Sequence, residues 1–72
     1  MVNINKLKGK IVERELNISE LAKKIGMDRA TLYRKFNANG ETFSIKEADL
    51  ITEALDLSLK EATSIFFSQY VS

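Results

Sequence analysis

The stretch Ile18–Asn37, ISELAKKIGMDRATLYRKFN, contains two short amphipathic segments separated by one glycine, Gly26. In the first segment, Leu21, Ala22 and Ile25 recur at helical spacing and predict a single apolar face. Glycine enters the left-handed backbone conformation without steric penalty, so a helix can end at Gly26 and the chain can turn sharply. The stretch is therefore predicted to form two helices joined by a tight turn.

Polar residues at the start of each segment support this interpretation. Asn17 can cap the first helix, and Glu20 is placed to accept a hydrogen bond from the backbone of the cap, as in a capping box. Asp28 can cap the second helix, Arg29–Phe36. Leu32 and Phe36 lie four residues apart in this helix and therefore share one face. Together these signals predict a helix-turn-helix.

Three more helices are predicted from apolar spacing and caps. The first follows Asn3 or Asn5, runs for about ten residues and has as its apolar stripe Ile4, Leu7, Ile11 and Val12. A capping box of the form S-x-x-E at residues 44–47 opens the next, whose apolar face is Ile45, Ala48, Ile51, Ala54 and Leu55. A second such box at residues 58–61 opens a short helix with the apolar residues Ala62, Ile65 and Phe66. We expect an all-α fold of five helices.

Two segments leave alternatives open. Gly9 lies inside the first predicted helix at a cost of ~1 kcal/mol relative to alanine, so either another helix packs closely there or the glycine is merely tolerated. The apolar tail after the last predicted helix either packs on the core or mediates self-association. A short strand from Ile65 to Val71, pairing with its copy in a second subunit, is one form of such association.

The composition favours a binding protein over an enzyme. The chain has 72 residues, 44% hydrophobic and 29% charged, which suits one globular domain spanning residues 1–72. It contains no cysteine and no histidine, which excludes disulfides, zinc fingers, a thiol nucleophile and an imidazole base. We therefore expect no enzymatic activity, metal, cofactor or small-molecule substrate. With no signal peptide and no apolar run of ~18 residues, a cytoplasmic location without membrane contact is expected.

The charge is divided unevenly along the chain. Residues 1–36 carry nine Lys or Arg against four Asp or Glu, a balance of +5, and residues 37–72 carry two against six, a balance of −4. Any one lysine is explained as part of a solvated helix face. A basic half that contains the helix-turn-helix nevertheless favours a polyanionic partner, with nucleic acid first.

The helix-turn-helix resembles the lambda-repressor-like, Cro-type DNA-binding domain of bacterial and phage regulators. The resemblance covers about residues 4–66 and is most specific in the spacing from alanine to glycine. The matching positions are Leu21, Ala22, Ile25, Gly26, Met27, Leu32, Phe36 and Asn37. Lys35 departs from the family, which usually buries an apolar side chain there; a lysine can lay its stem along the core and keep its ammonium in water. A looser resemblance to small Cro-like proteins of phages of Gram-positive bacteria, in LKGKI, SIKEA and IFF, implies an origin in a phage or mobile element.

The resemblance implies a sequence-specific regulator of transcription that binds double-stranded DNA with its second motif helix in the major groove. The matching positions for contacts to bases are Arg29, Ala30, Tyr33 and Arg34. Candidates for contacts to phosphates are Ser19, Thr31, Asn37, Asn39, Lys6 and Lys10.

A domain this small buries little surface on DNA, so we expect a homodimer on a pseudo-palindromic operator. The candidate interface is the apolar C-terminal end, with Ile65, Phe66, Phe67, Tyr70 and Val71. The alternative is a protein-interaction module, such as an antirepressor, that has the same fold and does not bind an operator.

Overall fold

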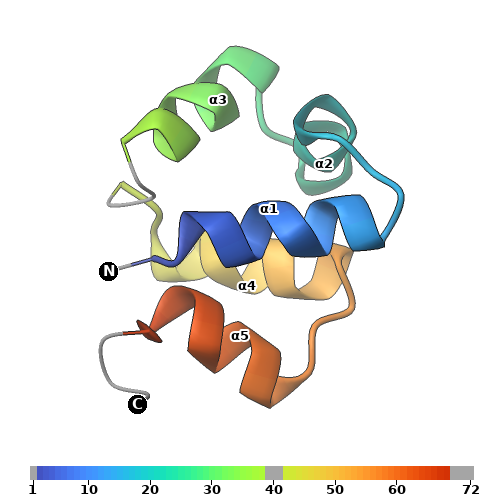
Figure 1. Ribbon diagram of the computed structural model, residues 1–72. Helices are drawn as coiled ribbons and strands as arrows, with labels where there is room; N and C mark the ends of the chain where they lie inside the picture. Colours follow the sequence, from blue (N-terminus) through green and yellow to red (C-terminus); the bar gives the residue numbers. More distant parts are fainter. Residues whose placement is uncertain (1, 39–41, 69–72) are drawn as a thin grey trace.

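The computed structural model describes residues 2–38 and 42–68, and in those residues the chain forms five α-helices and no strand. The helices are α1 (Ile4–Glu13), α2 (Ile18–Ile25), α3 (Arg29–Asn37), α4 (Ile45–Ala54) and α5 (Leu59–Phe66) (Figure 1). The all-α fold and the predicted positions of the helices are confirmed. Of the helices within this part of the chain, none has the length and hydropathy that crossing a bilayer requires.

The predicted caps are present. The Asn17 side chain accepts a hydrogen bond from the Glu20 backbone N–H at 2.8 Å, and the Glu20 carboxylate accepts one from the Asn17 N–H at 3.0 Å. The same reciprocal pair occurs at the starts of α4 and α5. Of the two asparagines considered for α1, Asn3 is the cap. Gly26 has φ 71°, the left-handed conformation predicted for the turn between α2 and α3.

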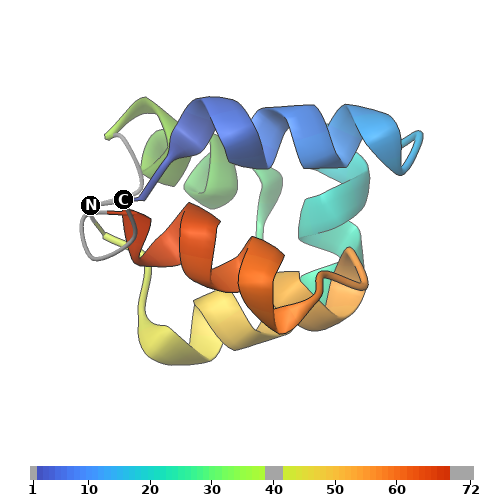
Figure 2. The same cartoon turned by 60° about the horizontal axis from the view of Figure 1, so that its bottom comes forward.

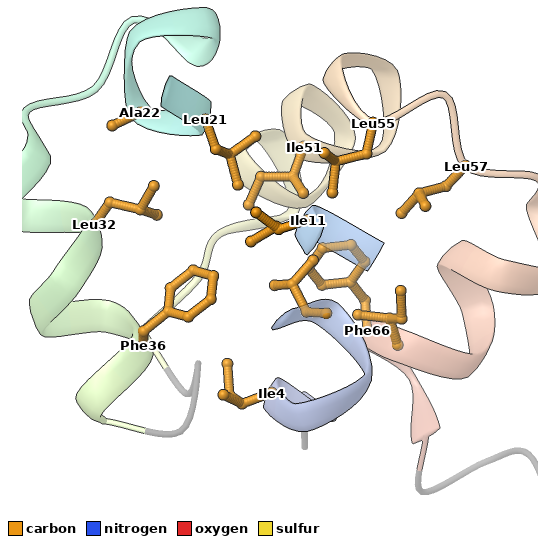
Figure 3. Packing of buried hydrophobic residues seen from close by; sticks show 12 residues of the cluster. Ile4, Ile11, Leu21, Ala22, Leu32, Phe36, Ile51, Leu55, Leu57 and Phe66 are labelled. Atoms are coloured by element: carbon orange, nitrogen blue, oxygen red, sulfur yellow. The ribbon is translucent and has the colours of Figure 1, made fainter. Parts of the chain in front are cut away.

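The core forms where apolar side chains of every helix meet (Figure 3). α2 contributes Leu21 and Ala22, and α3 contributes Leu32 and Phe36. α1 and α5 lie side by side, and the Asn3 N–H donates to the Ile65 carbonyl at 2.7 Å, which joins the start of α1 to the end of α5 (Figure 2). The remaining buried residues are Ile4, Leu7, Ile11, Ile51, Leu55, Leu57, Ile65 and Phe66.

The prediction of burial is wrong for two apolar residues, Val12 and Ile45. The start of the C-terminal strand considered from Ile65 to Val71 is wrong as well. Val12 is 72% exposed, because it lies one residue beyond Ile11, about 100° further round the helix, where α1 faces solvent. Ile45 is the first residue of α4 and is 83% exposed. Ile65 and Phe66 belong to α5, so no strand begins there; residues 69–71 of the predicted strand lie outside the described residues.

Gly9 is a tolerated glycine and not a point of close packing. A Cβ built on Gly9 would meet nothing within 4 Å, and the residue is exposed. A Cβ built on Gly26 also has space around it, but the backbone there has the positive φ that disfavours other residues. The two glycines therefore differ in backbone conformation and not in crowding.

An ion pair connects α1 to α5. The Lys10 ammonium contacts the carboxylate of Glu61, and it lies 3.2 Å from that of Glu13. The Lys10 hydrogen bond, followed by that from the Ser58 backbone, lowers the pKa of Glu61 to about 2. The hydrogen bonds of Lys10 to Glu61 and then to Glu13 raise the pKa of Lys10.

We expect alanine at the two glycines to have opposite effects on stability. Gly9→Ala should stabilise the fold by about 1 kcal/mol, or roughly 4–8 °C in melting temperature, because alanine favours a helix and nothing obstructs its methyl group. Gly26→Ala should destabilise it by about 1 kcal/mol, because alanine is strained at positive φ. Thermal melts followed by circular dichroism test both, and a loss of stability for Gly9→Ala would contradict the structure at α1.

The Lys10–Glu61 pair predicts loss of stability in acid. A carboxyl group whose pKa is lowered by folding stabilises the fold above its unfolded pKa, and that stabilisation disappears as the pH falls through the folded value. For Glu61 the range runs from 4.5 down to about 2. Glu61→Gln keeps the cap but cannot titrate, so its urea midpoint should decline less than that of the parent over this range. Glu53→Gln, at an exposed glutamate of α4, is the control and should decline as the parent does.

Candidate nucleic-acid interface

α3 is supported from one side. It packs chiefly against α2, and its buried side chains are Leu32 and Phe36. Its opposite side runs along the edge of the molecule, where no other helix of the described chain covers it (Figure 1). A helix held in this way presents a complete face to a partner.

The four residues predicted to contact bases all lie on exposed positions of α3. Arg29, Ala30, Tyr33 and Arg34 have the spacing of one helical face, and Tyr33 is 43% exposed. The Arg34 guanidinium donates to the Thr31 hydroxyl at 3.2 Å, which orders it along the helix surface. This face carries two guanidinium groups and a phenol, all of which can donate hydrogen bonds to base edges or phosphates.

Asp28 is occupied by the start of α3. One carboxylate oxygen accepts hydrogen bonds from the backbone N–H groups of Ala30 and Thr31, at 3.0 and 3.3 Å. These bonds satisfy helix-terminal donors, and the negative charge complements the dipole of α3. The acidic residue beside the basic face is explained by the cap.

The residues predicted to contact phosphates are not all placed alike. Ser19 lies half-buried in the first turn of α2, Lys6 is exposed in the first turn of α1, and Asn37 is the exposed last residue of α3. Thr31 is half-buried and bonded to Arg34. Asn39 lies outside the described residues.

Lys10 has to be removed from the phosphate set. Its side chain is 18% exposed and its ammonium lies between the carboxylates of Glu13 and Glu61. Binding a phosphate there would bring a third anion beside the two carboxylates that already contact this ammonium. The sequence did not indicate this partner, because Glu61 belongs to a distant helix.

Two further basic residues have structural contacts that the sequence did not reveal. Arg14 reaches from α1 to the end of α4, where its Nε donates to the Leu55 carbonyl at 2.8 Å. Lys35 donates from α3 to the Thr42 carbonyl at 2.9 Å and pairs with the Glu47 carboxylate at 3.2 Å. No local pattern indicated these partners, although the departure of Lys35 from the family had marked it as unusual.

The predicted dimer residues divide between core and surface. Ile65 and Phe66 are buried against the other helices, so their side chains are not available to a second subunit, and their assignment to an interface is corrected. Phe67 is 48% exposed, and Tyr70 and Val71 lie outside the described residues. Phe67 borders an apolar groove of about 250 Å³ between α4 and α5, together with the exposed Ile45 and Leu59.

Comparison with known proteins agrees with this geometry. The model of the Cro/C1-type HTH DNA-binding domain family matches residues 6–66, which includes all of α2, α3, α4 and α5. Comparisons with curated proteins and with solved structures gave no match. The family is one of DNA-binding transcription regulators and is not normally enzymatic. By the length of this match and the helix-turn-helix at α2 and α3, the chain belongs to the Cro/C1-type helix-turn-helix DNA-binding family.

Proposed function

We propose that this protein is a sequence-specific regulator, of the Cro or repressor kind, that reads double-stranded DNA by placing α3 in the major groove. The observation that carries the proposal is the face of α3, where Arg29, Tyr33 and Arg34 are exposed while Leu32 and Phe36 hold the helix from behind. An α-helix fits the major groove, where each base pair displays a distinct pattern of donors and acceptors. The resemblance to phage regulators supports an origin in a phage or mobile element.

Arg29 is the leading candidate for reading a base. It is the first residue of α3, the end of the helix that approaches base edges in this class of domain, and a guanidinium can bond O6 and N7 of guanine together. Ala30 is placed to contact a thymine methyl group. Tyr33 and Arg34, one turn further along the exposed face, reach either a base or a phosphate.

The phosphate backbone would be held on both sides of the groove. Ser19 and the N-terminal backbone N–H groups of α2 form one candidate contact, and Asn37 at the end of α3 forms another. The other proposed phosphate contacts are Thr31, which accepts a hydrogen bond from Arg34, and Asn39. Lys6 adds a positive charge from α1 that attracts DNA of any sequence.

A dimer would double the recognition surface. Ile45, Leu59 and Phe67 leave apolar area exposed beside the groove between α4 and α5, on the acidic half of the chain. We propose that a second copy covers this surface, so that two copies of α3 meet successive turns of a pseudo-palindromic operator.

Replacing Arg29 should change specificity without changing stability. In Arg29→Ala, discrimination at one base pair of an operator selected from random DNA should fall by about 1–3 kcal/mol, and the melting temperature should stay the same because the residue is exposed. Lys60→Ala removes the same charge from an exposed position on α5 and should leave the base preference unchanged. Equal affinity of the parent for selected and scrambled DNA would overturn the sequence-specific proposal and favour a protein partner.

The dimer is tested at Leu59, which is 85% exposed. Leu59→Ser should shift the mass measured by sedimentation from dimer to monomer while leaving the melting temperature of the monomer nearly unchanged, because no core contact is lost. Val12→Ser changes a side chain of α1 that is 72% exposed and should leave the dimer intact. A parent that sediments as a monomer at micromolar concentration, or a Leu59→Ser dimer, would contradict the proposed interface.

A further inference from the structure

We infer that Lys35 is a positioning residue for DNA binding, which holds the end of α3 against the start of α4 and thereby sets the placement of the recognition face. The inference rests on the proposed function of α3. Lys35 itself would not touch DNA, because its ammonium is occupied by protein oxygens on the side of α3 that faces the α3–α4 connection.

Among residues 2–38 and 42–68, the polar contacts of the Lys35 ammonium go to one segment, residues 42–47. Its Nζ donates to the Thr42 carbonyl at 2.9 Å, lies 3.2 Å from Oε1 of Glu47 and stands 5.9 Å from the centre of the Phe43 ring. The side chain is only 18% exposed. One ammonium thus joins the last turn of α3 to the residues that lead into α4 and to the first turn of α4.

An aromatic contact reinforces the same junction from the inside. The ring of Phe36, the neighbour of Lys35 on α3, meets Phe43 edge to face with centroids 5.9 Å apart. Phe43 meets Phe66 of α5 in the same manner at 6.3 Å. Two consecutive residues of α3 therefore hold the segment before α4, Lys35 through its hydrogen bond to Thr42 and Phe36 through the ring of Phe43.

The position of this junction explains why it should affect DNA binding. α3 packs chiefly against α2, and Lys35 and Phe36 add contacts that join its C-terminal end to the segment before α4 and to α4 itself. Tyr33, Arg34 and Asn37, all proposed DNA contacts, lie within two residues of Lys35. A shift of this end by a fraction of an ångström would misplace their donors relative to bases and phosphates.

Glu47 has two roles at once, and the chain contains a matched copy of the arrangement. Its Oε1 accepts from the Ser44 backbone N–H at 2.8 Å in the capping box of α4 while also pairing with Lys35, and these contacts, Ser44 first, lower the pKa of Glu47. Glu61 has the same two roles at the start of α5, with Lys10 as its partner. The Lys10–Glu61 pair joins α1 to α5 and includes no residue of α3, so it supplies a control.

The test compares Lys35→Met, Glu47→Gln and Glu61→Gln for affinity to the selected operator, well below each melting temperature. Methionine keeps the length of the stem without the charge, and glutamine at the third helical position keeps the capping box. Loss of an ion pair of about 1 kcal/mol predicts roughly fivefold weaker binding for Lys35→Met and a weakening in the same direction for Glu47→Gln. Glu61→Gln should bind as the parent does.

The salt dependence separates positioning from a direct phosphate contact. If Lys35 bound a phosphate, Lys35→Met would reduce the slope of log affinity against log salt by about 0.9, and Glu47→Gln would free the ammonium and tighten binding. As a positioning residue, Lys35 leaves the slope unchanged in both variants. Hydrogen exchange of the Ala38 amide, which donates to the Arg34 carbonyl at 3.0 Å, should accelerate in both variants without DNA present.

Each outcome has a definite meaning. A parent that binds DNA while Lys35→Met and Glu47→Gln bind equally well overturns this inference and leaves the proposed function standing. Tighter binding by Glu47→Gln also overturns it, in favour of a phosphate contact. A parent that binds no DNA overturns the proposed function and the inference with it. If Lys35→Met fails to fold, Glu47→Gln carries the test, with Lys35→Arg as the variant expected to retain parent affinity.

Discussion

The shared core is the constraint on which the rest of this structure depends, because none of its helices is long enough to be stable by itself. Each helix has between eight and ten residues, and isolated helices below ~12–15 residues are marginal in water. The helices exist because every one of them buries apolar side chains against the others. For α3 this means that Leu32 and Phe36, with the Asp28 cap, determine that the helix forms, and the outward residues are free to specify a partner.

Charged side chains then orient the helices that the core holds together. Lys10 joins α1 to α5, Arg14 joins α1 to the end of α4, and Lys35 joins α3 to the start of α4. Partly exposed ion pairs contribute little to stability, about 1 kcal/mol or less. These contacts matter instead for the relative orientation of the helices, since a hydrogen-bonded ammonium or guanidinium restricts how neighbouring helices tilt. Basic residues of the chain thus divide into those that hold helices together and those, such as Arg29, that remain exposed.

Much of the fold could be predicted because its signals are local. Asn17 and Glu20 cap each other within one turn, and Gly26 changes the backbone direction through its own conformation. The predicted base-contacting face is exposed as expected because the positions of Leu32 and Phe36 determine which side of α3 faces outward. The errors arose elsewhere: Val12 satisfies an apolar pattern but lies beyond the stripe that the core uses, and Lys10 satisfies a basic pattern but pairs with a carboxylate from another helix.

The sequence by itself determined where α2, α3, α4 and α5 begin, where the chain turns and which family the helix-turn-helix belongs to, since caps, glycine and short apolar spacings act within one or two turns. Only the tertiary structure decided the partners of Lys10, Arg14 and Lys35 and the burial of Ile65 and Phe66. It also showed that no other helix packs closely against Gly9 in the described part of the chain. Those outcomes depend on which helices meet in space. For Lys35, the ion pair with Glu47 exists because the end of α3 comes to lie beside the first turn of α4.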